Sequence, residues 1–270
     1  MAETNISFSG SIPQLYDRHL GPVLFEPYAA DLARRVAAQA TGPMLEMACG
    51  TGIVTHQLRA HLAPEVEIVA TDLSQPMLDY AKTKLPMLKN VTWRQADIAA
   101  LPFADASFPT VVCQFGLMFV PDKQAAFREA RRVLSKGGVF AFNVWDRIAA
   151  NPFAHIAHET LAKLFPVDPP QFLTPFTLNE HEVLRQLLTT HGFRGIHLET
   201  VTLEARSESA KALATGFIQG SPLSAAIQER GVSFESVIDA VTEALAQHGG
   251  AAPFRSILQA IVVTARAEAV

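Results

Sequence analysis

The sequence has few cysteines, no excess of positive charge and no long apolar run. Its two cysteines, Cys49 and Cys113, form no Cys-x-x-Cys pair and lie in or beside apolar segments, so we expect small buried thiols in a reducing cytoplasm. A formal net charge of −4 implies no broad cationic surface, which makes nucleic acid a poor partner. No apolar stretch approaches the roughly 20 residues that span a bilayer. The N-terminal segment also lacks the basic-then-apolar layout of a secretory signal, so we expect a cytoplasmic protein without a membrane span.

What the sequence does contain is a regular alternation of apolar runs and amphipathic segments. Hydrophobic residues make up 49% of the 270, which is ample for a packed core. Short apolar runs predict strands at about 43–48, 66–72, 91–97, 110–119, 139–145, 196–206 and 255–267. Apolar residues three or four positions apart predict helices at about 54–62, 74–85, 122–135 and 178–191. This alternation indicates an α/β fold, with a mostly parallel sheet covered by helices on both faces.

Capping and turn residues set the expected ends of these helices. Ser74 can cap the second helix, and Pro76 in its first turn is harmless because the missing N–H has no partner there. Residues 136–138, Lys-Gly-Gly, are expected to end the third helix. Asn179 or Thr177 is expected to cap the fourth.

The pattern changes after Trp145. Residues 147–176 contain five prolines and no clear strand, and residues 207–252 are typical of helices. We see no internal repeat and no linker, so these segments suggest a helical cap over one end of a single sheet.

In the segment MLEMACGTG, a turn rich in small residues directly follows the first predicted strand. Ligands of open α/β sheets bind at the carboxyl ends of strands, and Gly50 and Gly52 would allow a ligand to approach the main chain there. Asp72 ends the second strand, where its carboxylate can accept hydrogen bonds from both hydroxyls of a ribose. A third acid, Asp97, ends the third strand-like run.

A nicotinamide-binding Gly-x-Gly-x-x-Gly turn fits this segment poorly, because the loop starts with Ala48 and the position three after Gly52 is Thr55. Instead, four motifs occur in order, LEMACGTG, ATDLSQPML, QADIAALPFADASF and LSKGGVFAF. Together they closely resemble class I S-adenosylmethionine-dependent methyltransferases, of the small-molecule type that includes quinone-biosynthesis C-methyltransferases. The resemblance covers about residues 40–146 and is weaker to the end of the chain.

The resemblance implies a Rossmann-like sheet of seven strands, the last one antiparallel, with helical cap insertions. It implies S-adenosylmethionine as methyl donor, S-adenosylhomocysteine as product, and a small-molecule acceptor methylated by in-line displacement. The residues it assigns to the cofactor are Tyr16, Glu46, Ala48, Gly50, Gly52, Asp72, Leu73, Met77, Asp97, Ile98, Gln114 and Phe115.

Their implied roles follow the parts of the cofactor. Ala48 and the two glycines would line the methionine part, and Glu46 would orient its amino group or the loop. Asp72 would bind the ribose, with Leu73 and Met77 near the adenine. Asp97 and Ile98 would meet the adenine edge, and Gln114 and Phe115 would lie near the methyl group. Tyr16, on an N-terminal helix, would close the site with its ring facing the sulfonium.

Each role has a plainer alternative. Asp72 could cap a helix, and Asp97 could start a turn. Glu46 could brace the loop alone, and Gln114 could be a satisfied core amide. Tyr16 could simply pack its ring on the core.

No general base stands out, and the candidates are Tyr16, His19, His155 and His158. The last two share a helix face if their segment is helical, but they lack the third ligand that a metal needs, so we expect no metal. A general base typically contributes about 10²–10⁴-fold, less than the roughly 7 to 11 kcal/mol available from positioning. The missing base therefore does not count against methyl transfer.

Two positions depart from the family pattern. Ala48 replaces the first glycine of the loop and should be tolerated if its φ is negative. Pro109 replaces the family's usual aspartate after Ser-Phe, which affects a structural contact rather than the cofactor site.

We therefore expect one methyltransferase domain over residues 1–270, possibly as a homodimer. The expected core covers about 30–146, 177–206 and 253–270, and the expected cap covers about 1–29, 147–176 and 207–252. Two alternatives stay open: a non-catalytic regulatory protein that binds S-adenosylmethionine and, with less support, a nicotinamide-dependent oxidoreductase.

Overall fold

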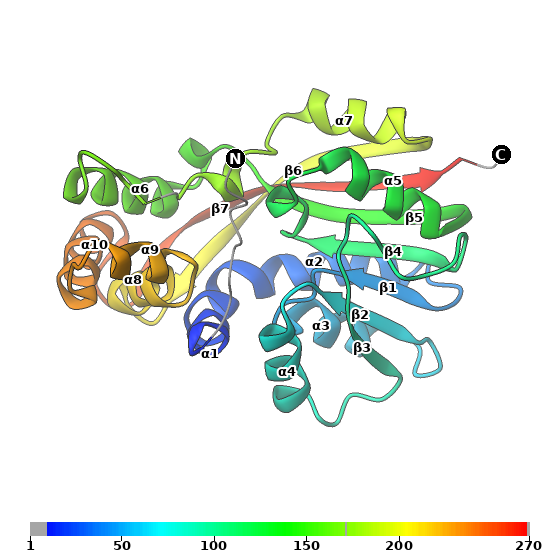
Figure 1. Cartoon of the computed structure of the whole chain (residues 1–270), viewed down its shortest axis with the longest axis horizontal. Coiled ribbons are helices and arrows are strands. Elements are labelled where there is room, and N and C mark those ends of the chain that lie inside the picture. Colours follow the sequence, from blue (N-terminus) through cyan, green and yellow to red (C-terminus); the bar gives the residue numbers. More distant parts are fainter. Residues whose placement is uncertain (1–9, 171, 269–270) are drawn as a thin grey trace. The chain divides into compact units, whose positions relative to one another are not determined.

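The computed structural model describes residues 10–170 and 172–268. Residues 1–9 and 171 of the expected cap and residues 269–270 of the expected core lie outside the described residues. A seven-stranded sheet has the strand order β3-β2-β1-β4-β5-β7-β6 (Figure 1). Its strands are β1 Met44–Met47, β2 Ile68–Asp72, β3 Val91–Gln95, β4 Phe108–Gln114, β5 Leu134–Trp145, β6 Phe193–Ser207 and β7 Phe254–Ala267.

Helices connect these strands and fill the segments between them. The α-helices are α1 Ile12–Leu15, α2 Glu26–Ala37, α3 Ile53–His61, α4 Gln75–Lys84, α5 Lys123–Val133, α6 Pro152–Leu164, α7 His181–Thr190, α8 Ala210–Gln219, α9 Leu223–Glu229 and α10 Phe234–Gly249. A π-helical segment, η1 Tyr16–Phe25, follows α1, and short 3₁₀ turns are η2 Leu117–Phe119, η3 Ile148–Ala150 and η4 Thr174–Phe176. Among the described residues, no helix combines the length and apolarity needed to cross a bilayer.

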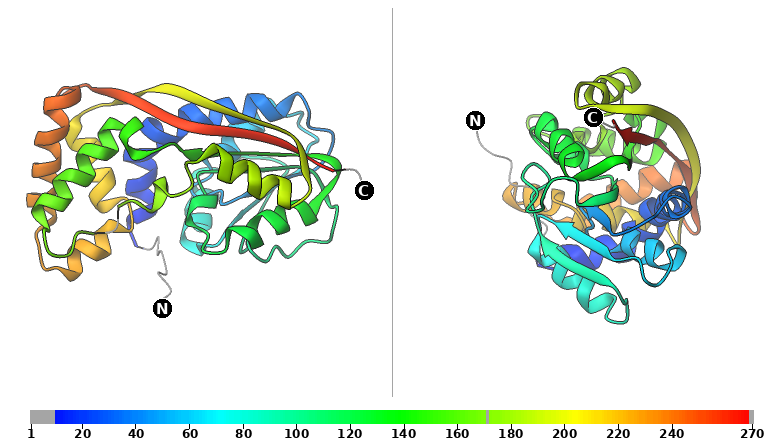
Figure 2. Two further views of the ribbon diagram at one scale, coloured as in Figure 1. Left: turned by 90° about the horizontal axis from the view of Figure 1, so that it is seen from above. Right: turned by 90° about the vertical axis from the view of Figure 1, so that its right-hand side faces the viewer.

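The chain divides into two compact units. Unit 1 consists of Met1–Phe25, Ile148–Leu173 and Thr202–Leu258, and unit 2 consists of Glu26–Arg147, Thr174–Val201 and Gln259–Val270. The strands β6 and β7 contribute residues to both units, and they lie side by side as neighbours in the sheet (Figure 2).

The sheet of unit 2 is parallel from β3 to β5 and antiparallel from β5 to β7. β1 lies at its centre and pairs in parallel with β2 and β4. All four residues of β1 are buried, which explains its continuous apolar run, whereas the edge strand β3 is largely exposed. β7 pairs with β5 in antiparallel register, so the predicted fold class is confirmed.

Helices cover this sheet as the sequence periodicity predicts. α2 packs against α3 and against β4 and β5, α4 packs against β2 and β3, and α5 packs against β5 and α7. Cys49 joins a small buried cluster with Ala70 and Leu78, and Cys113 is fully buried. Both cysteines are free thiols in the core, as expected.

In unit 1, the aromatic residues of the predicted cap form its own core. Phe153 stacks on Phe217 with ring centroids 6.0 Å apart, and Phe172 meets Phe217 edge-on at 5.7 Å. All three rings are buried. α8 packs so closely on η1 that a Cβ at Gly216 would lie 2.6 Å from Leu20 Cδ2. These phenylalanines therefore fill the unit's interior.

Three local expectations were wrong. The apolar run after β4 leaves the strand at Gln114 and turns into η2. α5 ends at Val133, and residues 136–138 lie within β5, inside the register shift between the Phe108–Leu134 and Thr110–Val139 pairs with β4. The N-cap of α7 is Glu180, one residue after Asn179 and three after Thr177, and its side chain makes no cap hydrogen bond. Ser74 does hold the N-cap position of α4, but without a side-chain cap bond.

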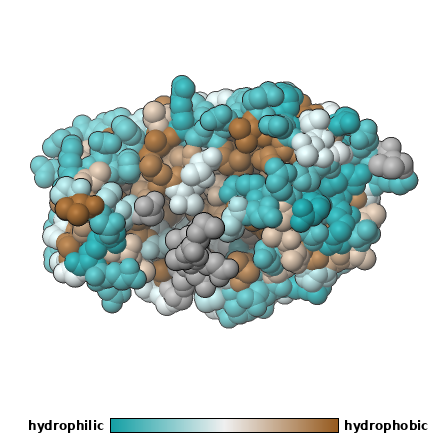
Figure 3. Space-filling model, turned by 45° about the horizontal axis from the view of Figure 1, so that its top comes forward, coloured by the Kyte–Doolittle hydropathy of each residue, from teal (hydrophilic) through white to brown (hydrophobic). Residues whose placement is uncertain are grey.

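Hydrophilic residues cover much of the face drawn in Figure 3, with smaller apolar areas between them. The large apolar side chains that are exposed are Leu73, Met87, Leu164, Val167, Leu173, Val183, Val232 and Ile257. Leu73 directly follows β2, at the sheet edge where the sequence places a ligand.

One buried hydroxyl in β4 is left without a partner. Thr110 is 1% exposed, and its Oγ1 has no hydrogen-bond partner among the described residues. An unsatisfied buried polar group costs about 1–3 kcal/mol, and valine has nearly the same shape without the hydroxyl. We expect Thr110→Val to raise the free energy of unfolding by about 1 kcal/mol in urea denaturation. A decrease would show that the hydroxyl is satisfied.

Candidate functional site

The register of the sheet brings one row of residues to its carboxyl edge. Met47, the last residue of β1, pairs with Thr71 of β2 and with Cys113 of β4. The residues at the next position along these three strands therefore lie abreast, and they are Ala48, Asp72 and Gln114.

Asp72 ties the turn after β1 to the end of β2. Its Oδ2 accepts a hydrogen bond from the Gly50 backbone N–H at 2.8 Å, and its Oδ1 accepts one from the Ser74 N–H at 2.8 Å. Burial raises the pKa of the Asp72 carboxyl, and the bonds from Ser74, Gly50 and Leu73 oppose that rise. Each carboxylate oxygen has two lone pairs, so both can still accept a ligand hydroxyl.

Glu46 is the most buried acid of the site, with 1% exposure in the middle of β1. The Thr55 hydroxyl donates to its Oε2 at 2.6 Å, while Oε1 is buried without a partner among the described residues. The pKa of Glu46 is raised to about 8. Desolvation is the main cause and the nearby Asp72 carboxylate adds to it, while the hydrogen bond from Thr55 opposes the rise. A buried carboxyl oxygen without a hydrogen-bond donor costs free energy. A cationic donor would lower this cost most, because it also stabilises the ionised carboxylate.

The turn after β1 adopts left-handed backbone at three positions. The φ angles are 53° at Ala48, 54° at Gly50 and 78° at Gly52. The expected tolerance of Ala48 required a negative φ, and that condition is not met. An alanine in this region carries a steric cost of roughly 1–2 kcal/mol, which the surrounding packing must offset.

The two glycines of the turn serve different purposes. A Cβ at Gly52 would lie 2.8 Å from Leu85 Cδ1 and 2.9 Å from Trp93 Cη2, so close packing against the α4 end and β3 explains this glycine. A Cβ at Gly50 would meet nothing within 4 Å. Open space at Gly50 leaves room for a ligand to approach the main chain.

The residues expected near an adenine divide by exposure. Leu73 is 63% exposed, whereas Ile98 at 8% and Met77 at 3% are both buried. Asp97 is exposed, and its Oδ1 accepts from the Ala99 N–H at 2.8 Å, so it also fits its plainer role at the start of a turn.

The end of β4 is held by a residue that the sequence analysis missed. Asn143 of β5 is completely buried; its Oδ1 accepts from the Phe115 N–H at 3.1 Å, and its Nδ2 donates to Gln114 Oε1 at 3.2 Å. Phe115 has a φ of 49° and stacks on Trp145 with centroids 4.0 Å apart. Tyr28 meets both rings edge-on. The signal for Asn143 was a lone polar residue in the apolar run FAFNVW.

The four base candidates all belong to unit 1. Tyr16 stacks on Phe25 at 4.8 Å, His158 stacks on Phe172 at 6.2 Å, and His155 is exposed on α6. Burial, followed by the charge of Arg18, lowers the pKa of His19, and Glu208 partly offsets this. The described residues include no group of three or more metal-ligating side chains.

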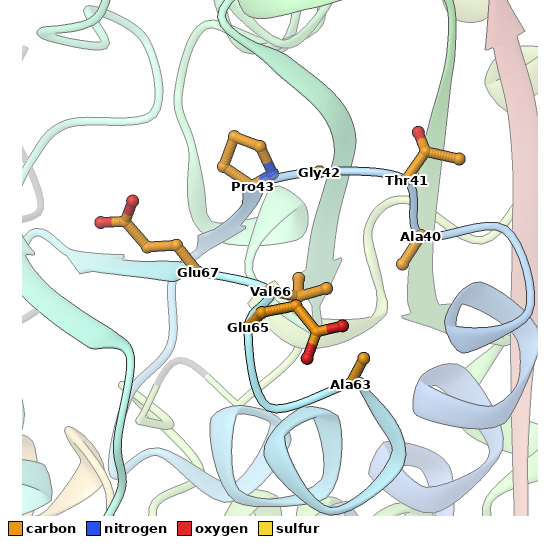
Figure 4. Close-up of a pocket in the computed structure, with 8 residues that line it drawn as sticks. All are labelled: Ala40, Thr41, Gly42, Pro43, Ala63, Glu65, Val66 and Glu67. Carbon is orange, nitrogen blue, oxygen red and sulfur yellow. The ribbon is translucent and has the colours of Figure 1, made fainter.

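A separate hollow lies at the opposite edge of the sheet, before β1 and β2 begin. Figure 4 shows its lining residues, Ala40, Thr41, Gly42, Pro43, Ala63, Glu65, Val66 and Glu67. None of the residues expected at the site belongs to it.

Comparisons with known proteins agree with this geometry. Residues 45–142 match the family model described as a methyltransferase domain. The chain is 30% identical to the demethylmenaquinone methyltransferase of Lactobacillus johnsonii over 60% of this chain and 71% of that protein. It is 35% identical to the Staphylococcus aureus enzyme of the same name over 48% of this chain, and spans just 55% of that relative's length.

A solved structure shares the fold over most of the chain. It is the phosphoethanolamine N-methyltransferase 2 of Haemonchus contortus in complex with S-adenosyl-L-methionine. The TM-score is 0.61 with 16% sequence identity, covering 95% of this chain and 56% of the other.

The chain belongs to the class I S-adenosylmethionine-dependent methyltransferases, of the small-molecule type. The predicted family, enzyme class and cofactor are thereby confirmed. The nicotinamide-dependent oxidoreductase loses its support.

The buried carboxyl of Glu46 predicts a distinct pH dependence of stability in the ligand-free protein. Its pKa is about 8 when folded and 4.5 without the fold, so the folded state holds an extra proton between these values. Stability should therefore fall as pH rises through this window, by up to about 1.4 kcal/mol per pH unit. Glu46→Gln should remove this slope and match the wild type below pH 4.5.

Urea denaturation from pH 4 to pH 8, roughly the window of the shift, measures this slope. Glu65→Gln, at an exposed position, is the control and should leave the slope unchanged. Parallel slopes for wild type and Glu46→Gln would mean that Glu46 is ionised in the ligand-free protein.

The strained Ala48 methyl predicts coupling to Gly116. A Cβ at Gly116 would lie 2.5 Å from Ala48 Cβ and 2.9 Å from Cys113 Sγ, while the Gly116 φ of −101° suits any residue. We expect Ala48→Gly to stabilise the protein by about 1 kcal/mol and Gly116→Ala to destabilise it by about 1–3 kcal/mol. The cost at Gly116 should shrink in the Ala48→Gly background, and strictly additive effects in denaturant unfolding would contradict this contact.

Proposed function

We propose that the turn after β1, together with Glu46 and Asp72, holds S-adenosylmethionine. Glu46 would accept a hydrogen bond from the amino group through its orphaned Oε1, and Asp72 would accept from the ribose hydroxyls. The observation that carries this proposal is a half-buried Asp72 bonded to the Gly50 backbone, next to a buried Glu46 with an orphaned oxygen, at a turn where a Cβ at Gly50 would meet open space.

The remaining residues fit the same ligand. Leu73 and Ile98 offer apolar surface on which an adenine could pack, and Asp97 offers an exposed carboxylate for its amine. Ala48 and Gly52 would line the methionine part, with Met77 behind them in the core. Tyr16 remains a proposed closing residue on the N-terminal helix.

When bound, S-adenosylmethionine supplies an electrophilic methyl group on a sulfonium. The residues of this chain would hold that group and an acceptor in line. Positioning of this kind can lower the activation barrier by roughly 7 to 11 kcal/mol. Gln114 and Phe115, at the end of β4, are the proposed residues beside the methyl group. If the acceptor needs a base, His19 is suited to take a proton, since its lowered pKa keeps it neutral at neutral pH.

We propose that the acceptor is a small, apolar or amphipathic molecule, and that the protein is cytoplasmic and able to form a homodimer. Support for the acceptor comes from the demethylmenaquinone methyltransferases to which the chain is similar. A screen of quinols, phenols and amines with labelled methyl donor tests this class. Label transferred only to amines would contradict it. A protein that binds the cofactor tightly and labels nothing would favour the non-catalytic alternative.

The ribose role of Asp72 makes a direct prediction. Removing a charged hydrogen-bond acceptor costs about 1.5–3 kcal/mol, so Asp72→Ala should weaken S-adenosylmethionine binding by roughly tenfold to a hundredfold. Calorimetry on the folded variant measures this. Asp79→Ala, on the exposed side of α4, is the matched control and should bind like the wild type. Unchanged affinity in Asp72→Ala would refute the ribose role.

A further inference from the structure

Residues 96–107 connect β3 to β4 without a helix, although β2 and β1 separate these two strands in the sheet. A connection between parallel strands usually contains an α-helix, which bonds its own backbone groups. The backbone groups of this segment must find partners elsewhere. Two side chains of α5 supply several of them, and neither belongs to the expected site residues.

Arg132 of α5 uses its whole guanidinium group to hold this segment. Its Nη2 donates to the Leu101 carbonyl at 2.8 Å, and its Nη1 donates to the Phe103 carbonyl at 2.7 Å and to Asp105 Oδ1 at 2.8 Å. The remaining N–H groups, on Nε and Nη2, donate to the two carboxylate oxygens of Glu129 at 2.8 and 2.7 Å. All five guanidinium donors are therefore used, an arrangement that the three donors of a lysine could not reproduce.

Leu101 is held at both of its backbone groups. While its carbonyl accepts from Arg132, its N–H donates to Glu129 Oε2 at 2.8 Å. The Leu101 side chain is buried, and just 13% of the Glu129 side chain is exposed. The hydrogen bond from Arg132 lowers the pKa of Glu129, so the ion pair persists at neutral pH. We call Arg132 and Glu129 the Leu101 clamp.

The turn 97–100, immediately before Leu101, carries the two residues expected at the adenine edge. On the other side of this turn, the Ala96 N–H donates to the Asp72 carbonyl at 3.0 Å. The turn itself is closed by a 3.1 Å backbone hydrogen bond between its last and first residues. It is therefore anchored at one end to the residue expected to bind the ribose and at the other end to the Leu101 clamp.

Ile98 places this turn against the candidate cofactor site. Its Cδ1 lies 3.8 Å from the position of a Cβ at Gly116, and that Cβ would lie 2.5 Å from Ala48 Cβ. The neighbouring Asp97 is exposed, and its carboxylate is the one that the proposed function offers to the adenine amine. A shift of the turn would move this acceptor away from that amine.

We propose that Arg132 and Glu129 are positioning residues that hold the turn 97–100 in place and thereby give the site its preference for adenine over a base that lacks the amine. The inference rests on the proposed function, because it takes Asp97 as the acceptor for that amine. A carboxylate accepts from an amine, whereas a carbonyl in the same place would set acceptor against acceptor. Discrimination of this kind depends on geometry, so it is lost when the turn can move.

The far part of the segment is attached independently of the Leu101 clamp. Phe103 packs edge-on against Phe108 with ring centroids 5.1 Å apart, and Arg94 Cζ lies 5.0 Å from the Phe103 centroid. The Ala106 N–H donates to the backbone oxygen of Arg132 at 2.9 Å, a bond that a side-chain substitution leaves in place. Replacing the Arg132 side chain should therefore loosen the turn without detaching the whole segment.

The test compares S-adenosylhomocysteine with S-inosylhomocysteine, in which a carbonyl replaces the adenine amine. Calorimetry on the full chain gives the affinity for each ligand, and thermal unfolding reports the fold of each variant. We expect the wild type to bind S-adenosylhomocysteine roughly tenfold or more tightly, as a charge-assisted hydrogen bond allows. A purely structural loss would weaken both ligands alike, whereas a displaced turn lowers the ratio of the two affinities.

Arg132→Met should reduce that ratio to about threefold or less. Arg132→Lys and Glu129→Gln should give intermediate ratios, because each keeps part of the clamp but not the two-pronged ion pair. In an Asp97→Asn background, the amide can face either base, so the ratio should be about one. Arg132→Met should change it no further there.

Two matched variants serve as controls, since each removes a charge near the Leu101 clamp but no contact with Leu101. Asp105 is 78% exposed, so its ion pair with Arg132 contributes little, and Arg128 is exposed on the same helix. Asp105→Asn and Arg128→Met should both keep the wild-type ratio. A loss in Arg128→Met equal to that in Arg132→Met would assign the effect to charge alone and contradict the inference.

Three further results would overturn the inference: no preference in the wild type, a full preference in folded Arg132→Met, or an effect of Arg132→Met that persists beside Asp97→Asn. If Arg132→Met does not fold, Arg132→Lys and Glu129→Gln decide, and a full preference in both overturns the inference. Failure of S-adenosylhomocysteine to bind the wild type would instead count against the proposed function, so the two failures are distinguishable.

Discussion

The hydrogen bond from the Gly50 backbone to the Asp72 carboxylate joins two neighbouring strand ends into one site. It is 2.8 Å long, and it fixes the turn after β1 against the end of β2. The left-handed backbone of that turn, the open space at Gly50 and the second bond of Asp72 to Ser74 all belong to the same arrangement. The bond holds Gly50, two residues after the strained Ala48.

The site also brings together two acidic side chains, Glu46 and Asp72, in which burial raises the pKa. Glu46 is buried with one oxygen bonded by Thr55 and the other orphaned, and Asp72 raises its pKa. A buried acid of this kind stays protonated until a cation arrives or the pH rises. A ligand with an ammonium group could donate to the orphaned oxygen of Glu46, and its ribose hydroxyls could donate to Asp72. S-adenosylmethionine, the cofactor of the family, carries both.

Much of this could be predicted from the sequence, because local signals and tertiary structure agree. The apolar run of β1, the glycines that follow it and the acid at the end of β2 were found from residue types alone. The order of strands and helices was correct for the same reason. What failed was local detail governed by tertiary contacts: Ala48 adopts a left-handed φ and lies against Gly116, and β5 begins at Leu134, which pairs with Phe108 of β4.

The role of Asn143 could not have been predicted, since it depends on the register between β4 and β5 rather than on any motif. Likewise, the sequence does not distinguish the roles of Gly50 and Gly52, but their packing does. A Cβ at Gly52 would clash with Leu85 and Trp93, whereas a Cβ at Gly50 would meet open space.

A crystal structure of the protein with S-adenosylhomocysteine tests the central claim most directly. The account predicts the ribose hydroxyls within hydrogen-bond distance of Asp72 and the amino group on Glu46 Oε1, with the main chain at Gly50 in contact with the ligand. Density for the nucleoside at another edge of the sheet, with the Asp72 carboxylate bonded only to the Gly50 and Ser74 backbone, would contradict it.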